Sequence, residues 1–205
     1  MKNLLALIGS LILSGCSVMG IRSSAEPTYE LLSETGDIQI RRYPPLLIAE
    51  TVIDADYAQA GNIGFNRLAG FIFGGNLQKQ QLAMTTPVFR ENAGEQIPMT
   101  APVLQEATDN KWTMAFVMPA NYSLDTLPTP IDPQVAIKAL PAKKVAVLRY
   151  SGSLNLEKIN EKSRLLSAWI EQQHLTPLSA PRSAAYDPPW TLPALRRNEI
   201  HIDIE

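Results

Sequence analysis

Short segments in which apolar and polar residues alternate predict several half-buried β-strands. Asp37–Ile53 is typical of two such strands on either side of Tyr43-Pro44-Pro45, because proline cannot donate a hydrogen bond to a strand ladder. Trp112–Met118 is a further apolar run of strand length, and Pro119 ends it. We therefore expect a sheet of short strands.

The strand predicted at the C-terminus alternates most regularly. Ile200, Ile202 and Ile204 fall on one face, whereas His201 and Asp203 fall on the other. In a strand, residues two apart share a face of the sheet. We expect the isoleucine face to be buried and His201 to be a solvated residue on the polar face.

Two longer segments have the apolar spacing of helices. The first begins at Asp54 or Asp56, since either carboxylate can cap a helix N-terminus, and it runs to about Phe73. Gly74-Gly75-Asn76 follows and ends it, because these residues tolerate the left-handed conformation found after helices. The second helix is expected from Leu154 to about His174.

The two predicted helices differ in their polar content. The second carries a full charged face, whereas Arg67 is the one charged residue of the first between Tyr57 and Phe73. Phe71 falls off the core stripe of this first helix. A helix that is apolar on more than one face needs a second cover. That cover could be another strand layer, a partner subunit or a flat apolar ligand.

The segment Leu82–Leu104 contains one phrase twice, as Met84-Thr85-Thr86-Pro87-Val88 and as Met99-Thr100-Ala101-Pro102-Val103. Two apolar runs around a polar run predict an antiparallel hairpin, here with Val88 opposite Met99. Prolines in both runs favour bent or edge strands. Because neither face is charged, we expect the hairpin to lie against protein or ligand, most simply in the core.

The chain also repeats itself at an offset of 97 residues, at which Ile38-Gln39-Ile40 matches Val135-Ala136-Ile137 and Val103 matches Ile200. The repeat spans strand, strand, helix, strand and strand, which predicts a duplicated ββαββ-type unit. Each half is too small to bury a core alone. We therefore expect one pseudo-symmetric α+β domain, a distorted antiparallel β-barrel with two helices.

Charge and cysteine content exclude some functions. The net charge of the 205-residue chain is −2, and no run of Lys and Arg is present, so nucleic acid is not an expected partner. Cys16 is the only cysteine. If it is modified, the folded part has no disulfide and no cysteine-based metal site.

The N-terminus has the features of a processed signal. Lys2 precedes the apolar run Leu4–Leu13, and Leu13-Ser14-Gly15-Cys16 follows; the apolar run is too short to span a bilayer. This ending resembles the lipobox of bacterial lipoproteins, in which the cysteine is acylated and becomes the mature N-terminus. An ordinary cleaved signal peptide is the alternative.

The resemblance to lipoproteins divides the chain into three parts. Residues 1–15 are the expected signal peptide, 16–27 a lipidated tether beginning at Cys16, and 28–205 the folded domain. Ser17, in place of Asp, follows the cysteine. In Gram-negative lipoproteins this pattern implies the outer membrane, so we expect a lipid-anchored protein of the cell envelope that faces the periplasm.

Several blocks of sequence occur in order between Glu26 and the C-terminus. They are Glu26-Pro27-Thr28-Tyr29, the repeated phrase of Leu82–Leu104, Ala115-Phe116-Val117-Met118-Pro119, and Tyr186-Asp187-Pro188-Pro189-Trp190 through Arg197-Asn198-Glu199. Together these blocks resemble the SOUL haem-binding protein family. The resemblance implies a distorted β-barrel with two helices and an internal repeat, which agrees with the pattern above.

The resemblance also implies haem or tetrapyrrole binding in a groove over the first helix, near the loop before the last strand. Carried onto this chain, the implied cofactor-binding residues are Phe65, Arg67, Leu68, Phe71, Ile72, Arg196 and Arg197. A planar guanidinium suits the carboxylate of a propionate. Arg196 and Arg197 could instead be solvated or paired with nearby acidic residues.

No dependable iron ligand comes with the resemblance. The chain has two histidines, His174 at a helix end and His201 in the last strand. Met84 and Met99 are soft candidate ligands, although core packing is the simpler interpretation for both. We expect weak haem binding by stacking and carboxylate pairing, without strong protein ligation of iron.

Three classes of function follow. The first is a haem or porphyrin carrier or buffer held at the membrane by its lipid anchor. The second is a module that binds another apolar ligand or an envelope protein. The third is an enzyme, since the architecture resembles the GyrI-like small-molecule-binding domains, some of which are hydrolytic. No thiol nucleophile, histidine pair or metal-ligand spacing supports catalysis, so we expect a protein that is not an enzyme.

Overall fold

The computed structural model describes residues 24–92 and 111–205. Cys16 and the phrase Met99–Val103 lie outside the described residues, so the predictions that rest on them alone stay predictions. The elements in chain order are β1 (Glu30–Thr35), β2 (Ile38–Tyr43), β3 (Leu46–Asp54), α2 (Tyr57–Ile72), β4 (Val88–Asn92), β5 (Lys111–Val117), β6 (Ala136–Leu140), β7 (Lys143–Tyr150), α3 (Leu156–Gln172), β8 (Arg182–Ala185), the 3₁₀ turn η1 (Pro193–Leu195) and β9 (Asn198–Ile204).

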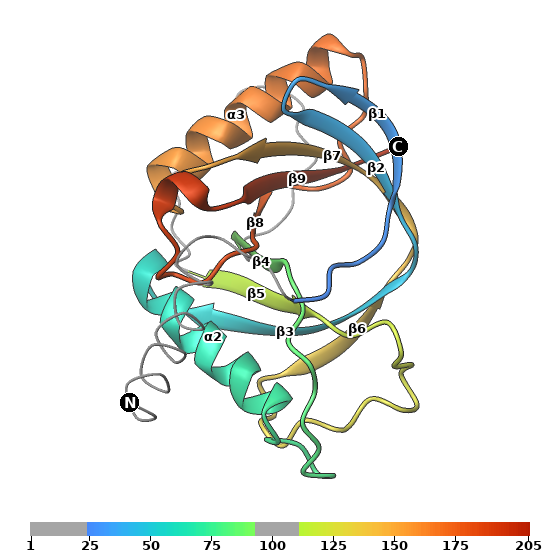
Figure 1. The fold of residues 1–205 in the computed structure, drawn as a ribbon, viewed down its shortest axis with the longest axis vertical. Coiled ribbons are helices and arrows are strands. Elements are labelled where there is room, and N and C mark those ends of the chain that lie inside the picture. The colour runs from blue at the N-terminus through green and yellow to red at the C-terminus, as the bar shows by residue number, and fades with distance from the viewer. Residues whose placement is uncertain (1–23, 93–110) are drawn as a thin grey trace, which may run out of the picture.

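The strands form one antiparallel sheet in the order β1-β2-β7-β9-β8-β4-β5-β3-β6. The sheet curls, with both helices on its outer side (Figure 1). The predicted α+β fold, a distorted barrel with two helices, is confirmed.

The strand order has an internal twofold pattern. When β2, β3, β4 and β5 are exchanged with β6, β7, β8 and β9, respectively, the strand order from β2 to β6 becomes the same order in reverse. Two ββαββ units would give this pattern; their origin by duplication stays a prediction. The offset of 97 relates Leu46 of β3 to Lys143 of β7, but the starts of β5 and β9, Lys111 and Asn198, differ by 87. The predicted match of Val103 with Ile200 stays a prediction, because Val103 lies outside the described residues.

Each helix buries its apolar stripe on one half of the sheet. Asp56 caps α2 by accepting a hydrogen bond from the backbone N–H of Gln59, and Gly74, at φ +108°, follows its end, as predicted. Leu68 of α2 belongs to the core cluster over β3 and β5, whereas Leu166 of α3 belongs to the cluster over β7 and β9. Among the described residues, no helix is long and apolar enough to cross a membrane.

The predicted hairpin differs from the structure at its first strand. β4 begins at Val88, directly after the cis peptide bond between Thr86 and Pro87. Val88 lies opposite Phe116 of β5 on one side and Ala185 of β8 on the other. Both edges of β4 are therefore occupied at Val88, and the predicted pairing of Val88 with Met99 is wrong.

The chain just before β1 contacts the domain. Ala25 forms a bridge with Thr85, and the carboxylate of Glu26 forms an ion pair with Arg197 at 3.0 Å. Both residues fall in the predicted tether. Its final residues are thus held against the fold.

Candidate functional site

The outer side of α2 carries part of the predicted haem site. Leu68, Phe71 and Ile72 are 0%, 2% and 1% exposed, because they point from the helix into the core. Phe65 is 40% exposed, and the guanidinium of Arg67 is partly buried. A ligand on the outer surface of α2 can therefore touch Phe65 and Arg67, while the other three support the helix from behind.

Phe65 and Arg67 lie on opposite flanks of α2. The ring of Phe65 meets Phe116 of β5 edge-on, with centroids 5.6 Å apart. Arg67 instead donates a hydrogen bond to the Thr51 hydroxyl of β3 at 2.7 Å and forms an ion pair with Asp132 at 3.4 Å. The helix surface between these two side chains is open to solvent.

The open surface of α2 contains apolar residues that the predicted set omitted. Ile63 and Phe73 are 41% and 62% exposed. A Cβ atom added at Gly70 would have no neighbour within 4 Å. This stretch is therefore apolar in part, low in relief and accessible.

Arg196 and Arg197 are engaged elsewhere in the fold. Arg196 donates to the carbonyl oxygens of Thr191, at 2.7 Å, and Pro189, which fixes the loop before β9. Arg197 binds the carboxylate of Glu199 at 2.9 Å in addition to Glu26. Within the described part of the chain, none of these hydrogen bonds or ion pairs reaches α2.

The carboxylate of Glu199 is the centre of a buried polar network. Arg41 donates to both of its oxygens, at 2.9 and 3.0 Å, and the hydroxyl of Tyr186 donates to it at 2.6 Å. His201 Nε2 lies 2.8 Å from the same carboxylate. Arg41 and Glu199 are fully buried, so each charge depends on the other.

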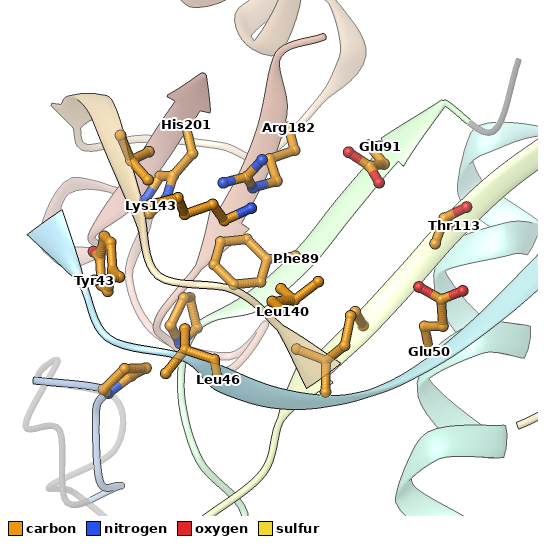
Figure 2. A pocket seen from close by; sticks show the side chains of 15 residues that line it. Tyr43, Leu46, Glu50, Phe89, Glu91, Thr113, Leu140, Lys143, Arg182 and His201 are labelled. Atoms are coloured by element: carbon orange, nitrogen blue, oxygen red, sulfur yellow. The ribbon is translucent and has the colours of Figure 1, made fainter. Parts of the chain in front are cut away.

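His201 corrects a sequence-based expectation. It lies on the polar face of β9, as predicted, but it is 1% exposed and not solvated. This face turns into the concave side of the curled sheet (Figure 2). Burial lowers the pKa of His201 to about 4, and the hydrogen bond with Glu199 opposes the shift only in part. Burial alone would raise the pKa of Glu199, but hydrogen bonds with His201 and Arg41 hold it well below its usual value.

A hollow opens on the concave side of the sheet, next to this network. Its lining comes from both halves of the chain, including Phe89 of β4, Leu140 of β6 and Lys143 of β7. Lys143, Arg182 and His201 lie toward one end and Glu91, Thr113 and Glu50 toward the other, with Phe89 and Leu140 between them (Figure 2).

Sequence reasoning missed both the network and the hollow. A signal was present, since Gln39, Arg41 and Tyr43 alternate with Ile38 and Ile40. Alternation of this kind predicts a half-buried strand with one face in solvent. The structure shows instead that Gln39, Arg41 and Tyr43 are buried, on the concave side of a sheet that curls away from its helices (Figure 1).

The described residues give haem no evident iron ligand. His201 is enclosed by the Glu199 network, and His174 follows the C-terminal end of α3. Within residues 24–92 and 111–205, no group of three His, Cys, Asp or Glu side chains is arranged to hold a metal.

Comparison with protein families shows to which family the chain belongs. The model of the SOUL heme-binding protein family matches residues 24–203, which is most of the chain and includes both helices and the whole sheet. The chain belongs to the SOUL heme-binding protein family. A comparison with curated proteins found no match.

Solved structures share the fold of this SOUL-family chain at low sequence identity. The C-terminal domain of EcmrR has a TM-score of 0.60 and 13% identity, over 86% of this chain and 98% of that one. An uncharacterized conserved protein from Listeria innocua has a TM-score of 0.58 and 10% identity, over 81% and 92%. A hydrolase from Listeria innocua has a TM-score of 0.55 and 8% identity, over 85% and 94%. At such identities these likenesses show the fold alone.

Proposed function

We propose that this protein binds haem or a related tetrapyrrole and serves as a carrier or buffer in the bacterial cell envelope. The observation that carries this proposal is the match to the SOUL heme-binding family over residues 24–203. The accessible, partly apolar surface of α2 supports it, because a large flat ligand needs such a surface.

The proposed porphyrin site is the outer face of α2. Phe65 would contact the macrocycle at one flank of the helix, and Arg67 would bind a propionate at the other by exchanging its ion pair with Asp132. Leu68, Phe71 and Ile72 would act indirectly, by fixing α2 on the sheet. Arg196 and Arg197 would bind propionates only by giving up part of their present hydrogen bonds.

The proposed location rests on the N-terminal sequence. The signal-like run before Cys16 and the resemblance of Leu13-Ser14-Gly15-Cys16 to a lipobox support a lipid anchor. Ser17 supports outer-membrane sorting. Metabolic labelling with a radioactive fatty acid, compared between the native chain and Cys16→Ser, tests this part of the proposal.

Titration of the purified full-length chain with haemin tests the site. We expect a shifted Soret band and an affinity that falls about tenfold for Phe65→Ala plus Arg67→Ala, because one aromatic contact and one charged contact are removed. Leu165→Ala is the matched control, since Leu165 is 50% exposed on the other helix. It should bind haemin like the native chain.

Two outcomes would separate the parts of this proposal. A native chain without any Soret shift would overturn haem binding itself. If the native chain, the Phe65→Ala plus Arg67→Ala variant and the Leu165→Ala control all shift the Soret band and bind haemin with equal affinity, haem binding is supported but the site does not lie on α2.

Binding, rather than catalysis, is the class we propose. The likeness to the Listeria innocua hydrolase is one of fold at 8% identity. In the concave hollow, Glu91 and His201 lie toward opposite ends (Figure 2), so these two titratable groups are not placed to act together on one bond. Turnover of a panel of esters and lactones would contradict the proposal.

A further inference from the structure

The concave hollow is a second candidate site, separate from the outer face of α2. It encloses about 120 Å³, which is less than the roughly 300–1,000 Å³ of pockets for drug-sized ligands. Its floor is apolar, with Ile48, Phe89 and Leu140 among the lining residues. Charged side chains stand at its two ends (Figure 2). The hollow therefore suits a small molecule that has an apolar middle and polar ends.

One end of the hollow has an excess of positive charge. Lys143 Nζ lies 2.5 Å from a carboxylate oxygen of Asp203, and the guanidinium of Arg182 binds the other oxygen of the same carboxylate. Two cations thus share one anion. The neighbouring His201 adds no charge at neutral pH, because burial lowers its pKa to about 4.

The other end has an excess of negative charge. Glu50 is paired with Lys138 of the neighbouring strand. Glu91 has no hydrogen-bond or ion-pair partner within the described ranges 24–92 and 111–205. Thr113, which is paired with Glu91 in the strand register, places a hydroxyl on the same side of the sheet.

The sheet register would allow Glu91 and Arg182 to form an ion pair, but the described residues show none between them, and Arg182 and Lys143 attract the Glu91 carboxylate only through space. Arg90 lies opposite Ser183, so the next positions along the two strands are Glu91 and Arg182. Arg182 turns to Asp203 instead. Burial raises the pKa of Glu91, and the attraction of Arg182 and Lys143 offsets this rise only in part. Burial and the neighbouring Arg182 lower the pKa of Lys143, and Asp203 and Glu91 offset this fall only in part, as expected for charges that lack full compensation.

We propose that the concave hollow binds a small zwitterion that carries an ammonium group and a carboxylate on a short apolar body. The carboxylate binds Lys143 and Arg182, the ammonium group binds Glu91 and the Thr113 hydroxyl, and the apolar body lies on Phe89 and Leu140. Such a ligand compensates both excess charges at once. A molecule with one charge compensates only one end.

Calorimetric titration of the purified full-length chain with three probes of equal length tests the charge requirement. We expect 6-aminohexanoate to bind about tenfold tighter than either hexylamine or hexanoate, since only the first makes charge-assisted contacts at both ends. Glycine and 4-aminobutyrate extend the series to shorter separations of the charges. Binding of hexylamine or hexanoate as tight as that of the best zwitterion would overturn the proposal, as would no binding of any zwitterion in the series.

Two substitutions assign the ends. Glu91→Gln should weaken the zwitterion about tenfold and leave hexanoate unchanged, whereas Lys143→Gln should weaken the zwitterion and leave hexylamine unchanged. Circular dichroism checks that each variant is folded. If a variant does not fold, the probe series on the native chain tests the proposal by itself. Equal zwitterion affinity in both folded variants and the native chain would overturn the assignment.

The same variants keep this site distinct from the haem site. Phe65→Ala plus Arg67→Ala should not change binding of the zwitterion, and Glu91→Gln should not change the haemin titration. Loss of both ligands in either variant would mean a single shared site and would overturn the proposal of a second one.

Discussion

The two faces of the curled sheet are stabilised by different chemistry. The outer face packs its apolar residues against α2 and α3, with Leu68 and Leu166 fully buried at the contacts. The concave face carries Arg41, Glu199 and His201, which are buried to a similar degree. Burial therefore does not distinguish apolar from charged residues in this fold, because the curvature of the sheet covers the face that the helices leave open.

The difference explains where each candidate ligand is expected. The helix-covered face is filled by the apolar side chains packed beneath α2 and α3, so the site that we propose for a large ligand is the outside of α2. The concave face has charges that the protein compensates unequally, from the fully paired Glu199 to Glu91. A small charged ligand can complete such a site, whereas haem cannot enter a space of about 120 Å³.

The largest expected effect is on the concave face. Glu199→Gln removes the charge that compensates Arg41, whose side chain is fully buried, so the free energy of unfolding should fall by about 3–5 kcal/mol. Urea denaturation measures it. The double variant Arg41→Met plus Glu199→Leu should cost less than the sum of the two single changes, because it removes both charges of the fully buried pair while Arg197 keeps its ion pair with Glu26. Strict additivity would mean that the network does not act as a unit.

On the outer face, Leu68→Ala should cost about 3 kcal/mol, because it opens a cavity between α2 and the sheet. Leu165→Ala is the control on α3, since half of that side chain is exposed; its cost should stay within about 0.5 kcal/mol. Thermal and urea unfolding measure both. Equal costs would contradict the assignment of Leu68 to the core.

The pH dependence of stability tests His201. Its pKa in the folded protein is about 4 and should return to about 6.5 on unfolding. Between these values the unfolded chain binds a proton that the folded chain does not, so stability falls as pH falls, by up to about 1.4 kcal/mol per unit. His201→Gln should flatten the slope between pH 6 and 5, whereas His174→Gln, at an exposed position, should not. If the stability contributed by His201 instead rose as pH fell from 6 to 5, His201 would be protonated in the folded state.

The smallest expected effect is on the open surface of α2. Gly70→Ala places a methyl group where no atom lies within 4 Å, so the free energy of unfolding should rise by roughly 0.5–1 kcal/mol through helix propensity. Chemical denaturation checks this value. A loss of stability would mean that another part of the protein covers this surface.

Local sequence patterns predicted the elements well. Cap residues and glycines placed α2 to within a residue or two. Alternation and prolines located β2, β3 and β9, and an apolar run of strand length located β5. The twofold strand order is compatible with the predicted repeat, whose origin by duplication stays a prediction. These features depend on neighbours in the chain, which the sequence displays directly.

The candidate sites were predicted less completely. The resemblance to the SOUL family selected α2, where Phe65 and Arg67 are accessible, but it could not tell that Leu68, Phe71 and Ile72 point inward. The pairing of Val88 with Met99 was wrong because two strands distant in the sequence, β5 and β8, occupy both edges of β4.

The sequence by itself determined the places of both helices and of strands β2, β3, β5 and β9, and which residues alternate between the faces of β2 and β9. Only the tertiary structure decided that the polar face would be buried and which charges would meet there. Arg41 and Glu199 are 158 residues apart, and Arg197 and Glu26 are 171 apart. Such pairs form because a curled antiparallel sheet brings distant strands together, and no local pattern records which strands those are.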